Sequence, residues 1–240
     1  MSDFKRKIGY ITPAVFRTPS DWNILLPPGV GMVAVALNVK AHRQEEFQRA
    51  IEAVKEGALT LKGEDAEVIV IAGTPLATLR GRSQEGSFLA ELESLTGLPT
   101  ITALGASVWA MEHLGLRRVA VATPYKKELN AGLKKYLEDS GITVSALKGC
   151  EVQRPVEADY LPPDTCMRVA REAYLLDERA DGVFVDGRWH VVAYIEELER
   201  QLRKPVVTSH QAVLWWSLRT MRVDARIEGF GSLFREPGRA

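Results

Sequence analysis

The sequence predicts an α/β protein with two similar doubly wound parallel-sheet domains, related by pseudo-twofold symmetry, and an active site in the cleft between them. Short apolar runs alternate with helical patterns along the 240 residues, as in parallel sheets covered by helices. A motif also occurs twice, because Pro, Thr, Ala and Trp recur at the same offsets in segments 99–109 and 205–215. A duplicated half makes two similar domains, and small ligands bind outside the carboxyl ends of strands in such sheets.

Most of the predicted strands are short, continuous and rich in Val and Ile, which is typical of buried parallel strands. In chain order, we expect strands at 7–12, 31–37, 67–71, 100–103, 118–122, 143–147, 182–185 and 205–207.

Helical patterns lie between the predicted strands, with short connections. We expect helices at 43–62, 88–96, 106–114, 126–140, 163–177, 191–203 and 211–220. The Pro-rich segment 18–29 and the segment 152–163 are predicted to be loops. The second of these is long enough to form a lid, and an ordinary surface loop is the alternative.

The predicted domain division follows the duplication. The first half comprises residues 1–114 plus 205–240, and the second half comprises residues 115–204. The last segment copies the one at residue 99, so it is expected to return to the first half or to bridge both. The sequence contains no Gly/Ser-rich linker, which indicates that the halves pack tightly.

Composition excludes several classes of function. The chain is 46% hydrophobic and 26% charged with zero formal net charge, which is ordinary globular usage and gives no general field for nucleic acid. Two cysteines and four dispersed histidines form no disulfide framework and no metal motif. No apolar run approaches the length of a membrane span. We expect a cytoplasmic protein, a monomer or homodimer, with a small-molecule partner and neither nucleic acid nor membrane.

The first candidate turn is Gly73-Thr74-Pro75, which follows an apolar strand. Glycine permits close backbone approach, a helix N-terminus favours an anion, and the Thr74 hydroxyl can donate to a carboxylate oxygen. The alternative is that Thr74 caps an ordinary helix and Pro75 is its first residue.

The second candidate turn, Asp186-Gly187-Arg188, also follows an apolar strand. Partial burial would raise the pKa of Asp186, which could then act as a general acid or base. The alternative is that Asp186 caps the next helix or pairs with Arg188. A third strand ends before Tyr125, whose hydroxyl can face the same cleft, and a tyrosine packed at the domain seam is the alternative.

These turns and other short motifs, taken in order, resemble the aspartate/glutamate racemase superfamily. The resemblance is closest to its arylmalonate decarboxylase branch, and maleate cis-trans isomerase is the next neighbour. It runs nearly end to end, through segments 7–13, 73–74, 80–81, 97–99, 114–125, 204–207 and 229–234.

The resemblance implies two α/β domains with the active site at their interface and no metal or organic cofactor. Racemases and the isomerase have a cysteine at each of the two turns. The decarboxylase keeps the second as proton donor and has Gly-Thr-Ser at the first, where hydroxyls and backbone N–H groups hold a carboxylate and then the enediolate. By position, Gly73 replaces the first cysteine, Thr74 and Tyr125 match family residues, and Gly187 matches the glycine after the second cysteine.

The chain departs from the family pattern at two positions. Asp186 occupies the place of the second cysteine, and Cys150 and Cys166 lie elsewhere in the sequence. Pro75 replaces the family serine, which removes a hydroxyl and a backbone N–H donor. Losing one oxyanion donor typically costs on the order of 10²–10³ in rate.

Three functions are weighed. The first is a cofactor-free decarboxylase of a small malonate-type acid, in which Thr74 and Tyr125 hold the carboxylate and protonated Asp186 delivers a proton. The second is an isomerase or racemase of the maleate isomerase or Asp/Glu racemase type, with His210 as a candidate second group. The third is a diverged protein that lacks the catalytic cysteines and binds a small molecule without turnover, in which Asp186 and Arg188 recognise an amine, hydroxyl or carboxylate.

The substrate's substituent is predicted less directly. Apolar residues around Pro13, together with Trp22 and Trp189, suggest a pocket that tolerates an apolar or aromatic group. Core packing explains the same residues equally well.

Overall fold

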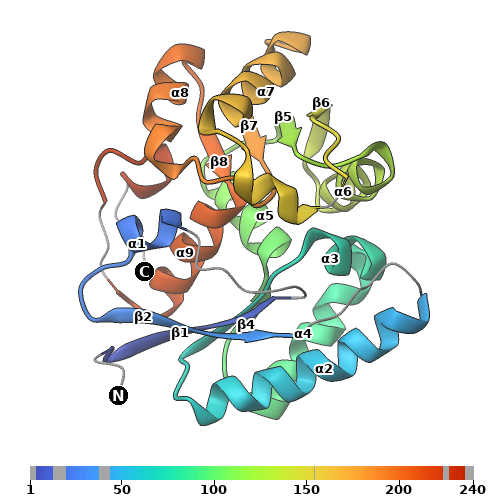
Figure 1. Ribbon diagram of the computed structural model, residues 1–240, viewed down its shortest axis with the longest axis vertical. Coiled ribbons are helices and arrows are strands. Elements are labelled where there is room, and N and C mark those ends of the chain that lie inside the picture. Colours follow the sequence, from blue (N-terminus) through green and yellow to red (C-terminus); the bar gives the residue numbers. More distant parts are fainter. Residues whose placement is uncertain (1–3, 13–19, 38–43, 154, 224–226, 236–240) are drawn as a thin grey trace.

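The structure is a computed structural model that describes residues 4–12, 20–37, 44–153, 155–223 and 227–235. It contains two four-stranded sheets, each wholly parallel, and helices flank both (Figure 1). The predicted α/β fold with two similar halves is therefore confirmed.

The first sheet has the strand order β2-β1-β3-β4. Its central strand β3 is buried at all four positions, which explains its unbroken Val-Ile-Val-Ile sequence. The strands are β1 (Arg6–Thr12), β2 (Val30–Ala36), β3 (Val68–Ile71) and β4 (Thr100–Thr102).

The second sheet has the equivalent order β6-β5-β7-β8. Its strand β7 occupies the same place as β3 in the first sheet and is likewise buried throughout. The strands are β5 (Arg118–Thr123), β6 (Thr143–Gly149), β7 (Gly182–Val185) and β8 (Val206–Thr208).

The helices cover the faces of these sheets, and α5 and α9 lie centrally between the two lobes (Figure 1). The α-helices are α1 (Ser20–Leu25), α2 (Gln44–Gly63), α3 (Thr74–Arg80), α4 (Arg82–Thr96), α5 (Ala103–His113), α6 (Lys127–Asp139), α7 (Pro163–Leu176), α8 (Ile195–Leu202) and α9 (Ser209–Thr220). Three short 3₁₀ helices are η1 (Pro155–Tyr160), η2 (Val192–Tyr194) and η3 (Ser232–Phe234). No helix in the described part of the chain is long and apolar enough to cross a membrane.

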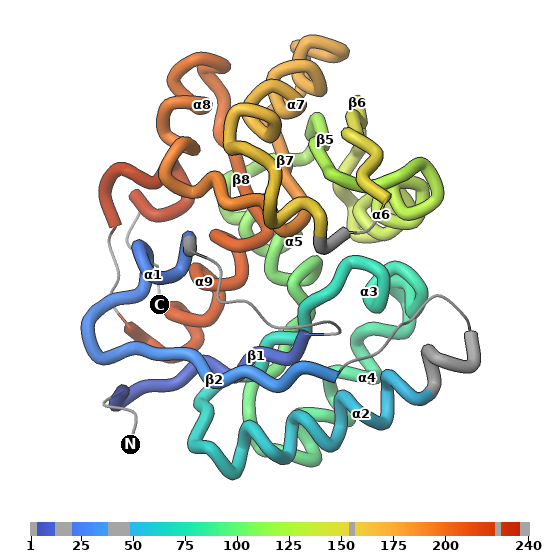
Figure 2. The backbone as a smooth tube through the Cα atoms, in the orientation of Figure 1, coloured from blue at the N-terminus to red at the C-terminus, as the bar shows by residue number. Residues whose placement is uncertain are grey.

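Helices α5 and α9 join the two halves. Each follows the last strand of one sheet, because α5 begins directly after β4 and α9 begins directly after β8. Their buried faces belong to one hydrophobic cluster that also includes residues of both sheets. The backbone trace shows the two helices next to each other between the lobes (Figure 2). This shared core fixes one half against the other.

The predicted domain boundary at residue 205 is wrong for strand β8. Hydrogen bonds pair β8 with β7, so residues Val206–Thr208 complete the second sheet. Helix α9 then packs against α5 and α1, so the segment after β8 bridges both halves. Each copy of the repeated motif thus forms the last strand of its own sheet and the helix that follows that strand.

Two predicted loops contain short helices instead. Helix α1 forms within the Pro-rich segment 18–29, and it buries Trp22 and Leu25, which are one helical turn apart. The 3₁₀ helix η1 forms within segment 152–163. Each has six residues, which is two turns or fewer and too short for apolar periodicity to mark them in the sequence.

A buried polar network also crosses the seam, which is the interface between the two halves. Glu85 of α4 is 2% exposed and accepts hydrogen bonds from Thr102 at the end of β4 and, at 2.6 Å, from the Tyr136 hydroxyl of α6. Arg82 neutralises the same carboxylate at 2.6 Å. Since α6 covers the second sheet, Tyr136 ties this half to the first.

Removing the Tyr136 hydroxyl should weaken this link. Tyr136→Phe removes one of the two donors to Oε2 of the buried Glu85 and leaves Arg82 as the other, so we expect unfolding free energy to fall by about 1–3 kcal/mol. Urea denaturation measures the loss. The matched control is Tyr174→Phe, whose hydroxyl bonds a carbonyl at an exposed site and which should change stability by less than about 0.5 kcal/mol. Equal effects of the two substitutions would contradict the role of this network.

Candidate active site at the seam between the halves

The first turn places a threonine hydroxyl at the seam. Strand β3 ends at Ile71, and Gly73 adopts a φ of 107°, a left-handed conformation that favours glycine. Helix α3 begins at Thr74, and its N-cap is Gly73, which supplies no side-chain cap. The alternative that Thr74 caps this helix is therefore wrong, and the Thr74 hydroxyl is available for other contacts.

The second turn is built in the same way. Strand β7 ends at Val185, and the next residue, Asp186, donates its backbone N–H to the Ala122 carbonyl of β5. Gly187 follows with a φ of 116°. A Cβ at Gly187 would lie 2.6 Å from Cδ of Pro124, so only glycine lets the chain turn against β5 here.

The two turns meet across the seam. The Thr74 hydroxyl donates to Oδ2 of Asp186 at 2.7 Å, and the Tyr125 hydroxyl lies 3.1 Å from Oγ1 of Thr74. All three side chains are buried. Residues from the carboxyl ends of β3, β5 and β7 therefore form one polar cluster, as the sequence placed them.

The carboxyl group of Asp186 is held in an unusual environment. Burial raises its pKa above the ordinary value, and hydrogen bonds from Thr74, Ser209, Gly187 and Tyr125 offset part of that rise. The direction agrees with what partial burial predicted from the sequence. A carboxyl group with a raised pKa keeps a proton at higher pH, which is what a general acid requires.

Tyr125 stays neutral in this cluster. Burial raises the pKa of its phenol well above the ordinary value, and the nearby Asp186 carboxyl adds to the rise. The hydroxyl therefore serves as a hydrogen-bond donor rather than as a base. The alternative for Tyr125, a tyrosine packed between the two halves, also describes what the structure shows. Its ring is buried, and its hydroxyl reaches Thr74 of the other half.

Arg188 does not pair with Asp186. Its guanidinium makes two hydrogen bonds of 2.7 Å to Asp159 of η1, through Nε and Nη2. Asp186 makes its contacts with Thr74, so the alternative of an Asp186–Arg188 pair is wrong. The lid or loop segment 152–163 is thus tied to the second turn by this ion pair.

Sequence reasoning missed Ser209, the first residue of α9. Its hydroxyl accepts the Gly187 N–H at 3.4 Å and hydrogen-bonds the Asp186 carboxyl. The duplication carries a signal for it, because Ser209 follows Thr208 at the end of β8 as Ala103 follows Thr102 at the end of β4. A polar residue where the other copy has alanine marks this turn as different.

Three candidate residues remain, and the structure places them differently. Pro75 is partly exposed and lies in the first turn of α3, where it lacks an N–H to offer. Pro13 lies outside the described residues. His210 is buried, and its Nδ1 lies 3.2 Å from a carboxylate oxygen of Asp21, which also accepts the Val192 N–H.

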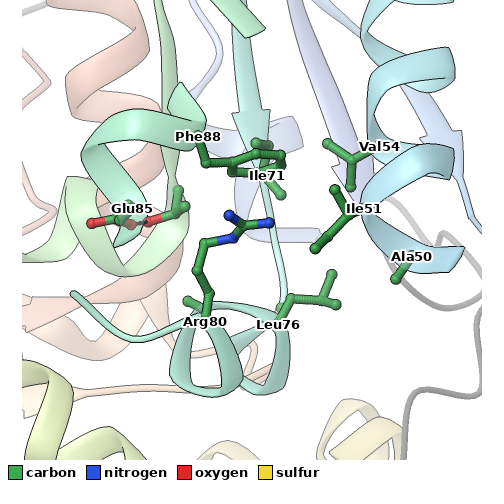
Figure 3. Close-up of a pocket in the computed structure, with 11 residues that line it drawn as sticks. Ala50, Ile51, Val54, Ile71, Leu76, Arg80, Glu85 and Phe88 are labelled. Atoms are coloured by element: carbon green, nitrogen blue, oxygen red, sulfur yellow. Dashed lines mark hydrogen bonds between the residues drawn. The ribbon is translucent and has the colours of Figure 1, made fainter. Parts of the chain in front are cut away.

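A pocket behind the first turn is too small for a substrate. It is lined by Gly73, Leu76 and Phe88, and the Arg80 guanidinium lies among apolar side chains there (Figure 3). Its volume of about 20 Å³ is room for about one water molecule. The polar cluster, and not this pocket, is therefore the candidate for chemistry.

The cluster can supply hydroxyl donors and one proton. Thr74 and Tyr125 can donate to a carboxylate, and Asp186, when protonated, can give a proton to a neighbouring atom. Among the described residues, no group of three or more His, Cys, Asp or Glu side chains could hold a metal ion. Cys166 is buried in α7 and Cys150 follows β6, so neither thiol takes the place that Asp186 occupies.

Comparison with known proteins shows which family the chain resembles. A family model described as arylmalonate decarboxylase matches residues 8–234. An arylmalonate decarboxylase from Bordetella bronchiseptica is 29% identical over 233 residues, which cover 94% of this chain and 95% of the relative. A maleate isomerase from Nocardia farcinica is also 29% identical, over 132 residues that cover 55% of this chain and 53% of the relative.

Solved structures show the same fold. Unliganded arylmalonate decarboxylase is 27% identical with a TM-score of 0.87, and the match covers 97% of this chain and 100% of that one. A maleate cis-trans isomerase of Nocardia farcinica bound to TRIS is 21% identical with a TM-score of 0.85, covering 96% of this chain and 98% of that one. The resemblance inferred from the sequence motifs is confirmed.

The left-handed turn at Gly187 makes a prediction about stability. Gly187→Ala forces a Cβ into Pro124 at a φ of 116°, and we expect unfolding free energy to fall by about 1–3 kcal/mol. Thermal unfolding measures the effect. Gly86→Ala is the control, because a Cβ there meets nothing within 4 Å in helix α4, and it should stabilise by about 0.5–1 kcal/mol. A neutral Gly187→Ala variant would contradict the close approach.

The raised pKa of Asp186 predicts a pH-dependent effect of Asp186→Asn. Below the ordinary Asp pKa of about 3.9, the carboxyl is protonated in both folded and unfolded chains, and the wild type bears no penalty. As pH rises from there through the raised folded pKa, ionising the buried group lowers wild-type stability. Asn also accepts the Thr74 hydrogen bond but does not ionise.

The stability of Asp186→Asn relative to the wild type should therefore increase with pH across that window. Urea denaturation at a series of pH values measures both proteins. Parallel stability curves would mean that Asp186 is not buried as a raised-pKa group.

Proposed function

Because the chain belongs to the arylmalonate decarboxylase family, we propose that it is a cofactor-free decarboxylase of a small, aryl- or alkyl-substituted malonate-type acid. The observation that carries the proposal is the contact of Thr74 with Tyr125 and Asp186 across the interface between the two halves. It places two hydroxyl donors beside a buried carboxyl group, which are the parts that such a reaction needs.

The hydroxyls of Thr74 and Tyr125 hold one carboxylate of the substrate. When the other carboxylate leaves as carbon dioxide, the electron pair of the broken C–C bond stays on the α-carbon and spreads into the carboxylate that is held. Donors aimed at the oxygens where this charge develops lower the barrier. The Gly187 N–H, now directed at Ser209, is a further donor in the same turn.

Asp186 then gives its proton to the α-carbon. The product is a monocarboxylic acid, and the Asp186 carboxylate regains a proton from water. Burial supports this role, because it favours the protonated form. The substrate's own negative charge favours it further, since two carboxylates in contact cannot both stay ionised.

Two features distinguish this site from the family pattern given above. A carboxyl group stands in place of a thiol as proton donor, and Pro75 provides neither a hydroxyl nor an N–H. Each donor that the enediolate lacks corresponds to a rate about 10²–10³ lower than a full set would give. Slow turnover is therefore part of the proposal.

The second candidate function is an isomerase or racemase, in keeping with the maleate isomerase relatives. The observation in its favour is the buried His210, held by Asp21. Gly73 has no acid or base at the first turn, so His210 would have to act as the second group. A diverged carboxylate-binding protein is the third, and it differs from both in having no turnover. In each case the proposed partner is a small acid, and the protein a cytoplasmic monomer or homodimer.

Proton NMR in D₂O distinguishes these functions. Purified protein is incubated with aryl- and alkylmalonates, maleate and amino acids. We expect loss of carbon dioxide from a malonate, with one deuteron at the α-carbon of the product. Asp186→Asn removes the proton donor and should lower the rate at least 10²-fold, and Thr74→Ala, which removes one donor, by about 10²-fold.

The control is Thr78→Ala, which should keep the parent rate, because among the described residues its hydroxyl bonds carbonyls within helix α3. Deuterium entry without loss of carbon dioxide would replace the proposal with racemisation. Conversion of maleate to fumarate would replace it with isomerisation. Full turnover by Asp186→Asn would remove Asp186 as the donor.

A further inference from the structure

The second turn carries an ion pair that the proposed chemistry does not use. Arg188 binds Asp159 through both Nε and Nη2, each at 2.7 Å, in the two-point geometry that fixes a guanidinium plane. The Asp159 side chain is 4% exposed and that of Arg188 is 26% exposed. The carboxylate is thus enclosed, and part of the Arg188 side chain stays accessible.

This guanidinium lies beside the reacting groups. Arg188 is two residues after Asp186, and its charge acts to lower the pKa of both Tyr125 and Tyr10. Burial prevails at Tyr10 and raises its pKa to about 12, with Asp186 and Asp159 adding to the rise. Tyr10 of β1 packs edge-on against Trp22, with 4.9 Å between the ring centroids. Residues of both halves, Tyr10 of the first and Arg188 and Tyr125 of the second, therefore lie near Asp186.

Arg188 has hydrogen-bond donors left over. A guanidinium has five N–H groups, and Asp159 uses two of them. Within the described part of the chain, Asp159 is the hydrogen-bond partner of Arg188. The two N–H groups on Nη1 and one on Nη2 therefore make no hydrogen bond to the described residues. The charge of the pair is already balanced, so these donors suit a neutral acceptor better than a second anion.

We propose that the Arg188–Asp159 pair determines substrate specificity, by donating from Arg188 to a neutral carbonyl or hydroxyl oxygen on the substituent of the α-carbon. The inference rests on the proposed function, because it takes the substrate's carboxylate to lie at Thr74 and Tyr125. It narrows the substrate to an acid whose alkyl substituent carries a hydrogen-bond acceptor.

Asp159 acts in this scheme as a positioning residue. It sits in η1, in the segment that connects β6 to α7, and holds the Arg188 side chain against the second turn. A free arginine on a turn would extend into water, where its donors lose their direction. The selectivity of the site thus depends on a residue that touches no substrate.

Three malonates of one shape test the proposal. Isobutylmalonate, carbamoylmethylmalonate and carboxymethylmalonate carry, respectively, an apolar, a neutral polar and an anionic substituent of equal size. Calorimetric titration measures the dissociation constants, and carbon dioxide release measures turnover. We expect the wild type to bind the carbamoylmethyl compound about tenfold more tightly than the isobutyl compound, the ratio for one hydrogen bond of about 1.4 kcal/mol. The carboxymethyl compound should bind more weakly than the carbamoylmethyl compound.

Substitutions identify the residues responsible. Arg188→Met should abolish the preference for the carbamoylmethyl compound, and Asp159→Asn should reduce it, while both retain binding of isobutylmalonate. Arg188→Lys keeps the charge without the planar fork and should restore only part of the preference. Arg203→Met removes an exposed arginine at the end of α8 and should keep the wild-type ratio. Thermal unfolding checks that each variant is folded.

The outcomes separate this inference from the proposed function. Selective binding without carbon dioxide release would support the recognition by Arg188 and reject the decarboxylase. Carbon dioxide release with equal binding of the isobutyl and carbamoylmethyl compounds would support the decarboxylase and reject the recognition by Arg188. Tighter binding of the carboxymethyl compound would show that Arg188 prefers an anionic acceptor and reject the proposed neutral one. If none of the three compounds binds, both the proposed function and this inference are rejected.

Discussion

One hydrogen bond organises this molecule's candidate site: the 2.7 Å contact between the Thr74 hydroxyl and the Asp186 carboxyl. Its partners come from different halves of the chain, and each follows a buried strand of its own sheet. The contact therefore exists only when both sheets are formed and correctly oriented. It makes a polar site out of two turns that, taken alone, are ordinary strand-to-helix connections.

The packing around this contact is what holds it in place. Helices α5 and α9 share one hydrophobic cluster with both sheets, and the Glu85–Tyr136 bond adds a buried polar link between α4 and α6. A packed interior transmits small displacements rather than absorbing them. The distance between Thr74 and Asp186 thus depends on residues far from either, and the chemistry of the site on the rigidity of the seam.

The environment of Asp186 also explains how a carboxyl group can stand where the resemblance implies a thiol. An exposed aspartate is ionised at neutral pH and has no proton to give. Burial beside Thr74, Tyr125 and Ser209 shifts the balance toward the protonated acid while leaving the group hydrogen-bonded. The same two turns that position Asp186 therefore also adjust its acidity, and Arg188, fixed by Asp159, is the recognition element that we propose beside it.

The sequence by itself determined the two-sheet fold and the positions of the main candidate site residues. Strands buried on both faces must be continuous apolar runs, so all eight predicted strands correspond to strands of the structure, with ends that differ by a residue or two. Parallel strands end at one edge of a sheet, so Thr74, Tyr125 and Asp186 could be placed there without coordinates. The helices α1 and η1 were missed, because six residues are too few to show a periodic pattern.

Only the tertiary structure decided which side chains meet. The Arg188–Asp159 pair, the Ser209 contacts and the membership of β8 in the second sheet all join residues that are distant in the sequence. No local propensity encodes such partners, since an aspartate in a loop and a serine after a strand are each compatible with many neighbours. They are fixed by how the two sheets twist and pack, and that is a property of the whole chain.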